Sequence, residues 1–347
     1  MKIAYIISSR KKKGPVVVVR DLVKLFTRNG HECTVYYFDE SDEIDFDCPM
    51  HQINLKSKVR FSDYDIVHCH GVRPSCFVTL HKPLFSKTCF VTSIHSYIFQ
   101  DFYFQYGRWK YLFYCLTAFL FVVRFDALIV SSKHAVQYYK RFLPWMPIRY
   151  TYNTVTISGE SLSPDEIKQI KDFRGHSVLV GCNASLNLRK GQHLLIEAIR
   201  DLPNYKLFLL GNGKEEEYYK TLVKQYHLED RVFFNGFRPN SARFLPMYDI
   251  YAMPSFSEGC PLALLEAAAV GCRTVCSNIP VLEEMFSENE AVFFDIKHPA
   301  TLVDALKQVM QKQDLEKNIT ARFQRDYSED AIYQHLYDIY QDQISKK

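Results

Sequence analysis

The stretch that decides the fold reads YDIYAMPSFSEGCPLALLE and runs from Tyr248 to Glu266. Its first six residues predict a short apolar strand. The residues from Pro261 onward predict a helix with a proline in its first turn and Gly271 just past its end. Glu258 and Glu266 lie eight positions apart around that helix start, where backbone amides favour anions. A carboxylate can accept two hydrogen bonds from a vicinal diol, so the stretch favours a diphosphate flanked by two diols, which is a nucleotide sugar.

Apolar strands and helices alternate along the rest of the chain. We expect strands at residues 2–7, 32–38, 64–69, 89–94 and 127–130, and again at 177–181, 207–210, 232–234, 250–253 and 273–276. Short apolar strands separated by helices predict parallel sheets with helices on both faces. Ligands bind such sheets at the C-terminal ends of the strands. The predicted fold class is therefore α/β, with two Rossmann-like, doubly wound domains.

The chain has 347 residues, enough for two domains of ordinary size. We expect an N-terminal domain over residues 1–157 and a C-terminal domain over residues 177–328. Residues 158–176 are polar and contain Pro164 and Gly175, so they are predicted to form a linker. Residues 329–347 are predicted to form a helix that returns to the N-terminal domain.

Composition and charge exclude several classes of protein. Hydrophobic residues make up 47% and charged residues 24%, which is typical of a globular protein. The net charge of +4 fits phosphate ligands or an anionic membrane surface and argues against a nucleic-acid-binding protein. Ten cysteines without a CxxC pair indicate reduced thiols. Because residues 1–9 hold too short an apolar run for a signal peptide, we expect a cytoplasmic protein, or one peripheral on the inner face of the cell membrane.

The longest uncharged run covers residues 111–123 and is too short to span a bilayer. It is either a buried helix of the N-terminal domain or a helix at the domain surface that enters the membrane interface. Aromatic and basic residues around it, over residues 103–125, have the chemistry of an interfacial contact.

Several short motifs accompany the two glutamates. They are Gly30–Val35, Asp65–Gly71, Thr92–His95, Ala127–Ser132, Arg189-Lys190-Gly191 and Leu210–Gly213. With the E-x7-E pair of Glu258 and Glu266 they resemble, over nearly the whole chain, a retaining GT-B glycosyltransferase of family 4 (glycosyl transferases group 1) of the bacterial polysaccharide type. The resemblance implies that the two Rossmann-like domains face each other across a cleft. It also implies that the C-terminal domain binds the nucleotide sugar and the N-terminal domain binds the acceptor.

The resemblance also implies roles for the glutamates. Glu266 would hold the ribose hydroxyls of the nucleotide, and Glu258 would contact the hydroxyls of the donor sugar as a catalytic residue. The backbone amides of the intervening turn would meet sugar and phosphate, and its residues are Gly259, Cys260, Pro261 and Leu262. The remaining residues that it implies for the nucleotide site are Gly211, Gly236 and Phe237. Two glutamates on a helix are ordinarily a solvated face, but the apolar residues around Glu266 favour the functional interpretation.

Arg189 and Lys190 resemble the diphosphate clamp of the family, with Lys190 in a catalytic role. Departure of a nucleoside diphosphate leaves negative charge that cations stabilise. Cations at a helix start oppose the helix dipole, which favours a ligand role over a structural one. Many family members carry an arginine directly after the glycine that matches Gly181, whereas this chain has Cys182 there. We expect Arg189 to supply the missing charge.

Histidines at strand ends are the candidates in the N-terminal domain. The resemblance implies that His95 assists catalysis by hydrogen bonding near the donor sugar and the diphosphate, although a lone histidine is often structural. His68 and His70 alternate on one strand and lack a third metal ligand, so we predict no metal site. The acceptor-side candidates are Gly14 and His70.

The loop at residues 10–15 follows the first predicted strand and is rich in lysine, and Gly14 is what it keeps of the glycine-rich turn that the family usually has there. Its lysines either attract a phosphate-bearing lipid acceptor or are simply solvated. A dinucleotide dehydrogenase is disfavoured, because no GxGxxG motif follows the first strand.

The expected function is therefore transfer of a hexosyl or N-acetylhexosaminyl group with retention of configuration. The donor would be a nucleotide sugar, with UDP favoured. The acceptor would be a polysaccharide or a polyprenyl-diphosphate-linked oligosaccharide in cell-surface glycan biosynthesis. No cofactor or metal is expected. Two alternatives stay open: a non-catalytic glycosyltransferase-like subunit that binds nucleotide sugar or glycan, and a GT-B sugar-nucleotide 2-epimerase.

Overall fold

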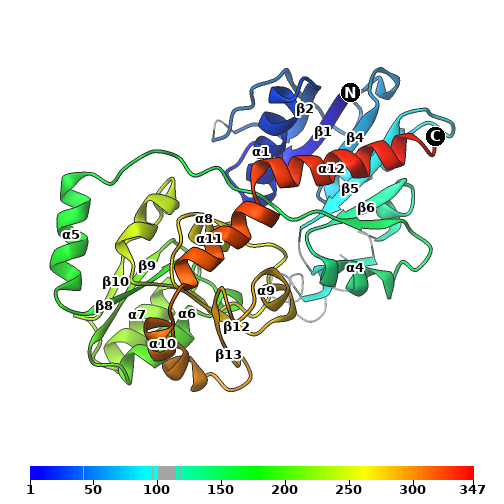
Figure 1. Ribbon diagram of the computed structural model, residues 1–347. Coiled ribbons are helices and arrows are strands. Elements are labelled where there is room, and N and C mark those ends of the chain that lie inside the picture. The colour runs from blue at the N-terminus through cyan, green and yellow to red at the C-terminus, as the bar shows by residue number, and fades with distance from the viewer. Residues whose placement is uncertain (42, 96, 101–114, 117–118) are drawn as a thin grey trace. The chain divides into compact units, whose positions relative to one another are not determined.

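The computed structural model describes residues 1–41, 43–95, 97–100, 115–116 and 119–347. The chain forms two compact units (Figure 1). Unit 1 consists of Met1–Val155 together with Tyr327–Lys347, and unit 2 consists of Thr156–Asp326. Each unit has its own parallel sheet, so the predicted fold class, two Rossmann-like doubly wound domains, is confirmed.

Unit 1 is built on a sheet whose strand order, in the described part of the chain, is β3-β2-β1-β4-β5-β6-β7. Its strands are β1 (Lys2–Ser9), β2 (Glu32–Asp39), β3 (Met50–Gln52), β4 (Ile66–His70), β5 (Cys89–Ile94), β6 (Ala127–Val130) and β7 (Ile148–Tyr150). Its helices include α1 (Gly14–Arg28), α2 (Val72–His81), α4 (Lys133–Lys140) and α12 (Glu329–Ile344). The chain runs outward from β1 to β3 and then returns to the other side of β1 with β4. The direction of winding therefore reverses between β1 and β4.

The C-terminal helix α12 packs along α1 in unit 1 (Figure 1). The aromatic ring of Phe26 on α1 contacts Tyr333 and Tyr340 at centroid distances of 5.2 and 5.3 Å. Arg28 pairs with Glu329 and Asp330 at the start of α12. Aromatic burial and these ion pairs explain why the last helix belongs to the first unit.

Unit 2 is built on a sheet with the described strand order β10-β9-β8-β11-β12-β13. Its strands are β8 (Val178–Asn183), β9 (Tyr205–Leu210), β10 (Val232–Phe234), β11 (Ile250–Met253), β12 (Thr274–Ser277) and β13 (Val292–Phe294). Its helices include α5 (Pro164–Arg174), α6 (Gln192–Arg200), α7 (Glu216–Gln225), α8 (Leu262–Ala269), α9 (Pro280–Met285), α10 (Thr301–Gln311) and α11 (Leu315–Asp326). Here the direction of winding reverses between β8 and β11.

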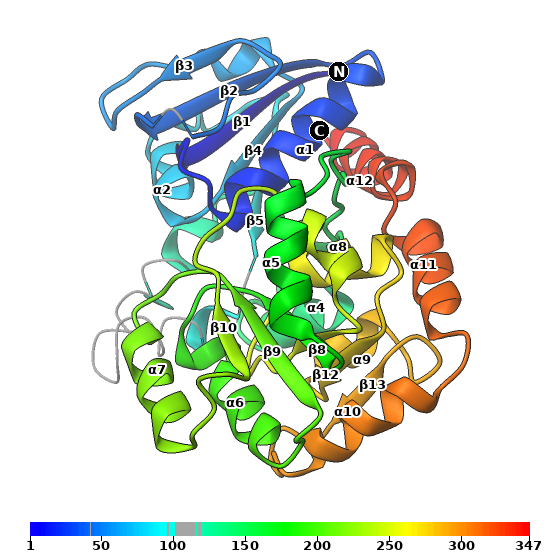
Figure 2. The ribbon, with the colours of Figure 1, turned by 90° about the vertical axis from the view of Figure 1, so that its left-hand side faces the viewer.

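Most of the segment predicted as a linker, residues 158–176, is the helix α5 of unit 2 (Figure 2). Ser163 and Glu166 cap it with reciprocal hydrogen bonds, a capping box that was readable in the sequence. Phe173 packs on Phe233 of β10, and Arg174 pairs with Asp249 at 2.8 Å. These contacts fix α5 to the sheet, so the prediction of a linker of that length is wrong.

The interfacial segment predicted at residues 103–125 lies largely outside the described residues. Within the part that is described, residues 115–116 and 119–122 are helical. Cys115 and Val122 are buried, while Leu116, Leu120 and Val123 are exposed. No helix in the described ranges is both long enough and apolar enough to cross a membrane.

Candidate functional site

The two segments singled out in unit 2 meet at the point where its winding reverses. β8 and β11 are neighbours in the sheet, and the loop after β8 carries Lys190 while the turn after β11 carries Glu258. Open α/β sheets bind ligands at this place, beyond the carboxyl ends of the strands. Gly191 makes the approach possible, because a Cβ there would lie 2.0 Å from the carbonyl oxygen of Pro254. The close approach of the backbone therefore requires glycine at position 191, next to the charged Lys190.

Glu258 is buried, and two cations surround its carboxylate. Nζ of Lys190 lies 2.6 Å from Oε1, and Nη1 of Arg189 lies 3.7 Å from Oε2. Burial by itself raises the pKa of Glu258, but attraction by Lys190 and Arg189 outweighs it and the pKa ends below its ordinary value. The guanidinium of Arg189 also donates to the carbonyl of Ser257. The structure thus brings together the predicted clamp and the first glutamate as a buried ionic cluster.

The helix α8 begins one residue later than predicted. Pro261 occupies the N-cap, with φ −72° and ψ 121°, rather than the first turn. The first amides of a helix have no partner within it, so the end of α8 that follows the turn has the chemistry of an anion site. Glu266 lies one turn along α8 and is half-buried, between the buried Leu265 and Ala267.

Position 182 has no room for an arginine. Cys182 is 2% exposed and packs in the core of unit 2 with Val180 and Leu209. Its neighbour Gly181 faces the ring of Tyr248, which a Cβ at Gly181 would approach to 2.1 Å. The departure from the family pattern therefore has a packing explanation, and the nearby guanidinium that the structure provides is that of Arg189.

The glycines predicted for the nucleotide site lie together. The amide of Gly211, after β9, donates to the carbonyl of Gly236, after β10, at 2.8 Å. Both glycines have positive φ, 139° and 68°, which other residues rarely adopt. Phe237 follows with 58% of its surface exposed. An exposed aromatic face beside two close backbone segments suits stacking on a flat base.

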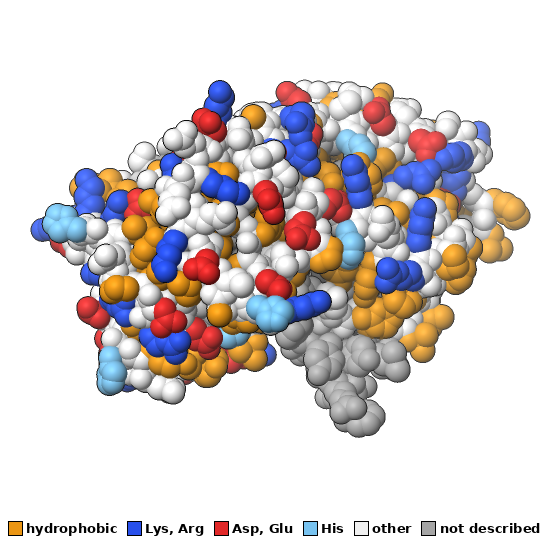
Figure 3. Space-filling model, turned by 60° about the horizontal axis from the view of Figure 1, so that its bottom comes forward, with side chains coloured by type: hydrophobic (Ala, Val, Ile, Leu, Met, Phe, Trp, Pro, Cys, Tyr) orange, Lys and Arg blue, Asp and Glu red, His pale blue; other side chains and the backbone are white. Residues whose placement is uncertain are grey.

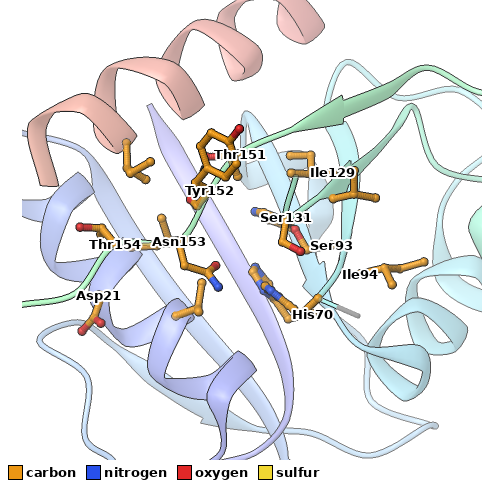
Figure 4. Close-up of a pocket in the computed structure, with 16 residues that line it drawn as sticks. Asp21, His70, Ser93, Ile94, Ile129, Ser131, Thr151, Tyr152, Asn153 and Thr154 are labelled. Carbon is orange, nitrogen blue, oxygen red and sulfur yellow. Dashed lines mark hydrogen bonds between the residues drawn. The ribbon is translucent and has the colours of Figure 1, made fainter. Parts of the chain in front are cut away.

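The histidine candidates form a cluster in unit 1, and Figure 4 shows one of them, His70, among the residues that line a pocket. Nδ1 of His70 lies 2.8 Å from Nε2 of His95. His68 is held by Tyr340 and Ser93, at 2.6 and 2.7 Å. Burial lowers the pKa of His68 to about 3, that of His95 to about 4, and that of His70 well below its ordinary value. All three rings are therefore neutral near pH 7.

This cluster lines a cavity of about 20 Å³, room for one water-sized group. Sequence reasoning missed several of its lining residues: Asp21, Ser93, Ser131, Asn153 and Thr154. Ser93 and Ser131 follow the same strand-end rule that identified His95 and were within reach of it. Among the described residues, no group of three or more His, Cys, Asp or Glu side chains is arranged to hold a metal ion. Gly14 begins α1 and is not among the residues that line the cavity.

The basic loop at residues 10–15 is only partly solvated. Arg10 is buried and donates to Glu40, Asp45 and the carbonyl of Ile44. It therefore fixes the acidic loop that follows β2, while residues 11–13 remain exposed.

Comparison with known proteins agrees with this geometry. The model of the glycosyl transferases group 1 matches residues 163–326, and that of glycosyltransferase family 4 matches residues 13–158. The O-antigen biosynthesis glycosyltransferase WclY of Escherichia coli is 34% identical over 97% of this chain and 98% of its own length. An N-acetylgalactosamine-N,N'-diacetylbacillosaminyl-diphospho-undecaprenol 4-alpha-N-acetylgalactosaminyltransferase of Campylobacter jejuni is 27% identical over 38% of this chain and 37% of its own length.

Solved structures share the fold over the full length. Sucrose-phosphate synthase of Thermosynechococcus elongatus has a TM-score of 0.83 at 17% identity and covers 100% of both chains. Alr3699/HepE of Anabaena in complex with UDP has a TM-score of 0.81 at 18% identity, covering 99% of this chain and 100% of its own. The same Anabaena protein has also been solved with UDP-glucose, with a TM-score of 0.79 at 18% identity over 99% of this chain and 100% of its own.

Proposed function

This chain belongs to the family 4 glycosyltransferases of the group 1 type, and from that premise we propose the reaction. It transfers a sugar from a UDP-sugar to a glycan or lipid-linked oligosaccharide, with retention of configuration, in the assembly of a cell-surface polysaccharide. The observation that carries the proposal is the buried cluster of Arg189, Lys190 and Glu258 beside the start of α8. Cations and helix-start amides suited to a diphosphate, and carboxylates suited to sugar diols, lie next to the ends of β8 and β11, where the winding of the unit 2 sheet reverses.

The donor's parts match the groups of unit 2. Arg189, Lys190 and the amides before α8 bind the diphosphate and stabilise the charge that develops on it. Glu266 accepts hydrogen bonds from the ribose hydroxyls. Phe237 stacks on the base. Glu258, held ionised by its cations, accepts hydrogen bonds from the donor sugar.

The reaction needs no covalent enzyme intermediate in this scheme. The bond from the anomeric carbon to the diphosphate oxygen breaks, and the acceptor oxygen bonds to the same face of the sugar. The acceptor proton passes to the departing diphosphate, which leaves as UDP. His95 assists by hydrogen bonding to the donor, the part that the family resemblance implies. The reaction requires no metal, because cations and helix-start amides supply the positive charge.

The acceptor assignment is supported by two relatives. One is named for O-antigen biosynthesis and the other for a diphospho-undecaprenol acceptor. We therefore propose a polyprenyl-diphosphate-linked glycan as acceptor, bound by unit 1 with His70 on the acceptor side.

Contact with a membrane surface would give access to such an acceptor. Unit 1 exposes six large apolar side chains on or near α2 and the helical residues after 114: Leu80, Leu84, Phe85, Leu116, Leu120 and Val123. Figure 3 shows hydrophobic side chains together on part of the surface, with Lys and Arg side chains near some of them. Exposed apolar residues on a chain with a net charge of +4 suit the interface of an anionic bilayer. Co-sedimentation with vesicles should therefore increase with their anionic lipid content, and binding independent of that content would contradict the proposal.

The test is release of nucleoside diphosphate from a panel of UDP- and GDP-sugars. We expect turnover of a UDP-sugar that Glu258→Gln reduces on the order of 100-fold, as expected when a transition-state contact is lost. Glu217→Gln is the matched control, because the Glu217 side chain is exposed and its ion pair in the described structure is with Lys220 on the same helix. UDP-sugar binding without turnover, with every acceptor offered, would instead favour a non-catalytic subunit. Conversion of donor in the absence of acceptor would favour an epimerase.

A further inference from the structure

His70 contacts His95 through one ring nitrogen only. Nδ1 of His70 lies 2.8 Å from Nε2 of His95, and the two rings are stacked at a centroid distance of 5.1 Å. Both imidazoles are neutral near pH 7, since burial lowers both pKa values. A neutral pair at this distance shares one proton, so the tautomer of one ring sets the tautomer of the other.

The other nitrogen of His70 decides where that proton lies. Nε2 of His70 is buried and has no hydrogen-bond partner in the described part of the chain. The cavity beside it is lined by apolar residues such as Val18 and by polar residues such as Asp21 and Asn153, and none of the described polar atoms hydrogen-bonds Nε2. A buried N–H group that lacks an acceptor is rare in proteins. A buried acceptor atom, such as an unprotonated ring nitrogen, is tolerated better when it lacks a donor. This favours the tautomer in which Nδ1 of His70 carries the proton and donates it to Nε2 of His95.

The ring of His70 packs against two other rings, which restrict its orientation. His68 lies against it at a centroid distance of 4.2 Å, and Tyr5 at 6.1 Å. His68 itself cannot turn without losing a partner, because Tyr340 on α12 and Ser93 on β5 occupy its two nitrogens. The C-terminal helix thus anchors the cluster.

We propose that His70 is a positioning residue that fixes His95 as the Nδ1–H tautomer, so that His95 offers the substrate a hydrogen-bond donor and not a base. The proposal rests on the proposed function, in which His95 hydrogen-bonds the donor, and it specifies that His95 donates that hydrogen bond. A neutral N–H donor suits an oxygen that gains negative charge, such as the diphosphate oxygen of the breaking bond. It does not suit removal of a proton from the acceptor.

Two substitutions separate the hydrogen bond from the shape of the ring. His70→Asn keeps an N–H at the position of Nδ1, whereas His70→Phe keeps a flat ring and removes the donor. In His70→Phe we expect kcat to fall on the order of 10- to 100-fold, the range seen when a residue that orients a functional histidine is lost. The KM for the donor should change little, and His70→Asn should restore most of kcat. His81→Asn is the control, since the hydrogen bond that His81 makes in the described part of the chain is to the carbonyl of Phe77 on its own helix.

The tautomer itself is read from the ring-nitrogen resonances of ¹⁵N-histidine-labelled protein, assigned with a His95→Asn variant. The proposal predicts a protonated Nδ1 and a bare Nε2 on His95, preserved in His70→Asn and changed in His70→Phe. The opposite tautomer in the wild type, or the same spectrum in both variants, would overturn it. So would equal losses of kcat in both variants. This measurement needs no turnover, so absence of transferase activity would reject the proposed function without deciding the tautomer.

Discussion

Replacing Lys190 by methionine removes the nearer cation from a buried carboxylate. Glu258 is 5% exposed and its Oε1 lies 2.6 Å from Nζ of Lys190. Breaking a buried pair by deleting one partner costs about 3–5 kcal/mol, and Arg189, 3.7 Å from Oε2, keeps the expected loss near the lower value, about 3 kcal/mol. For a domain of this size that lowers the unfolding midpoint by about 6–12 °C.

The same substitution should make stability depend on pH in a defined direction. In the wild type the pKa of Glu258 lies below its ordinary value of 4.5, so its stabilising contribution is present above that pH and is lost as the pH falls. Without Lys190, burial raises the pKa of Glu258, and the ionised form of Glu258 destabilises the folded protein increasingly as the pH rises. The gap between wild type and Lys190→Met should therefore widen from pH 5 to pH 7.

Thermal and denaturant unfolding of the wild type, the two single variants and the double variant measures how strongly Lys190 and Glu258 are coupled in the free energy of unfolding. Adding Glu258→Gln to Lys190→Met should recover most of the lost stability, because no buried charge then lacks its partner. Lys220→Met, which breaks an exposed pair, should stay within about 0.5 kcal/mol of the wild type. Losses from the two substitutions that simply add, or a Lys190→Met protein as stable as the wild type, would refute the reasoning.

Three further predictions concern the unit 2 site. Gly191→Ala should abolish turnover and destabilise the protein, since the φ of Gly191 is +71° and the new Cβ would lie 2.0 Å from the carbonyl oxygen of Pro254. Circular dichroism and activity measurements check this, with Gly159→Ala as the control because nothing lies within 4 Å of a Cβ there. Glu266→Gln should raise the KM for the donor about 10-fold, the effect of weakening hydrogen bonds worth about 1.4 kcal/mol, and a change confined to kcat would argue against ribose binding. Activity should survive prolonged chelation with EDTA, and activity restored only by added divalent metal would contradict a metal-free site.

The ten predicted strands and the segments that carry Lys190 and Glu258 were within reach of the sequence, because they depend on local patterns, whereas the short edge strands β3, β7 and β13 were not predicted. The apolar strand before Pro254 and the helix after Pro261 set the reversal point, and Lys190-Gly191 follows the neighbouring strand. The start of α8 was misplaced by one residue, since proline is compatible with both the N-cap and the first turn. The helix in the predicted linker was overlooked although Ser163 and Glu166 form a capping box.

Contacts between distant segments could not be predicted in this way. Nothing near Tyr340 indicates that its hydroxyl bonds His68, 272 positions away. The packing of Cys182 in the core likewise depends on which face of β8 meets α6, a tertiary property. The sequence therefore indicated a missing charge at position 182, whereas the structure shows that this position is buried in the core of unit 2.

The most direct test of the account is equilibrium binding of UDP to the wild type and two variants. UDP carries the diphosphate and lacks the sugar, so its affinity should depend on Lys190 and not on Glu258. We predict that Lys190→Met/Glu258→Gln, which leaves no lone buried charge, weakens UDP binding at least about 10-fold, the loss of one charge-assisted contact of about 1.4 kcal/mol or more. Glu258→Gln alone, which releases Lys190 from its partner, should bind UDP at least as tightly as the wild type. Equal affinities in all three proteins would contradict a nucleoside diphosphate site at the end of β8.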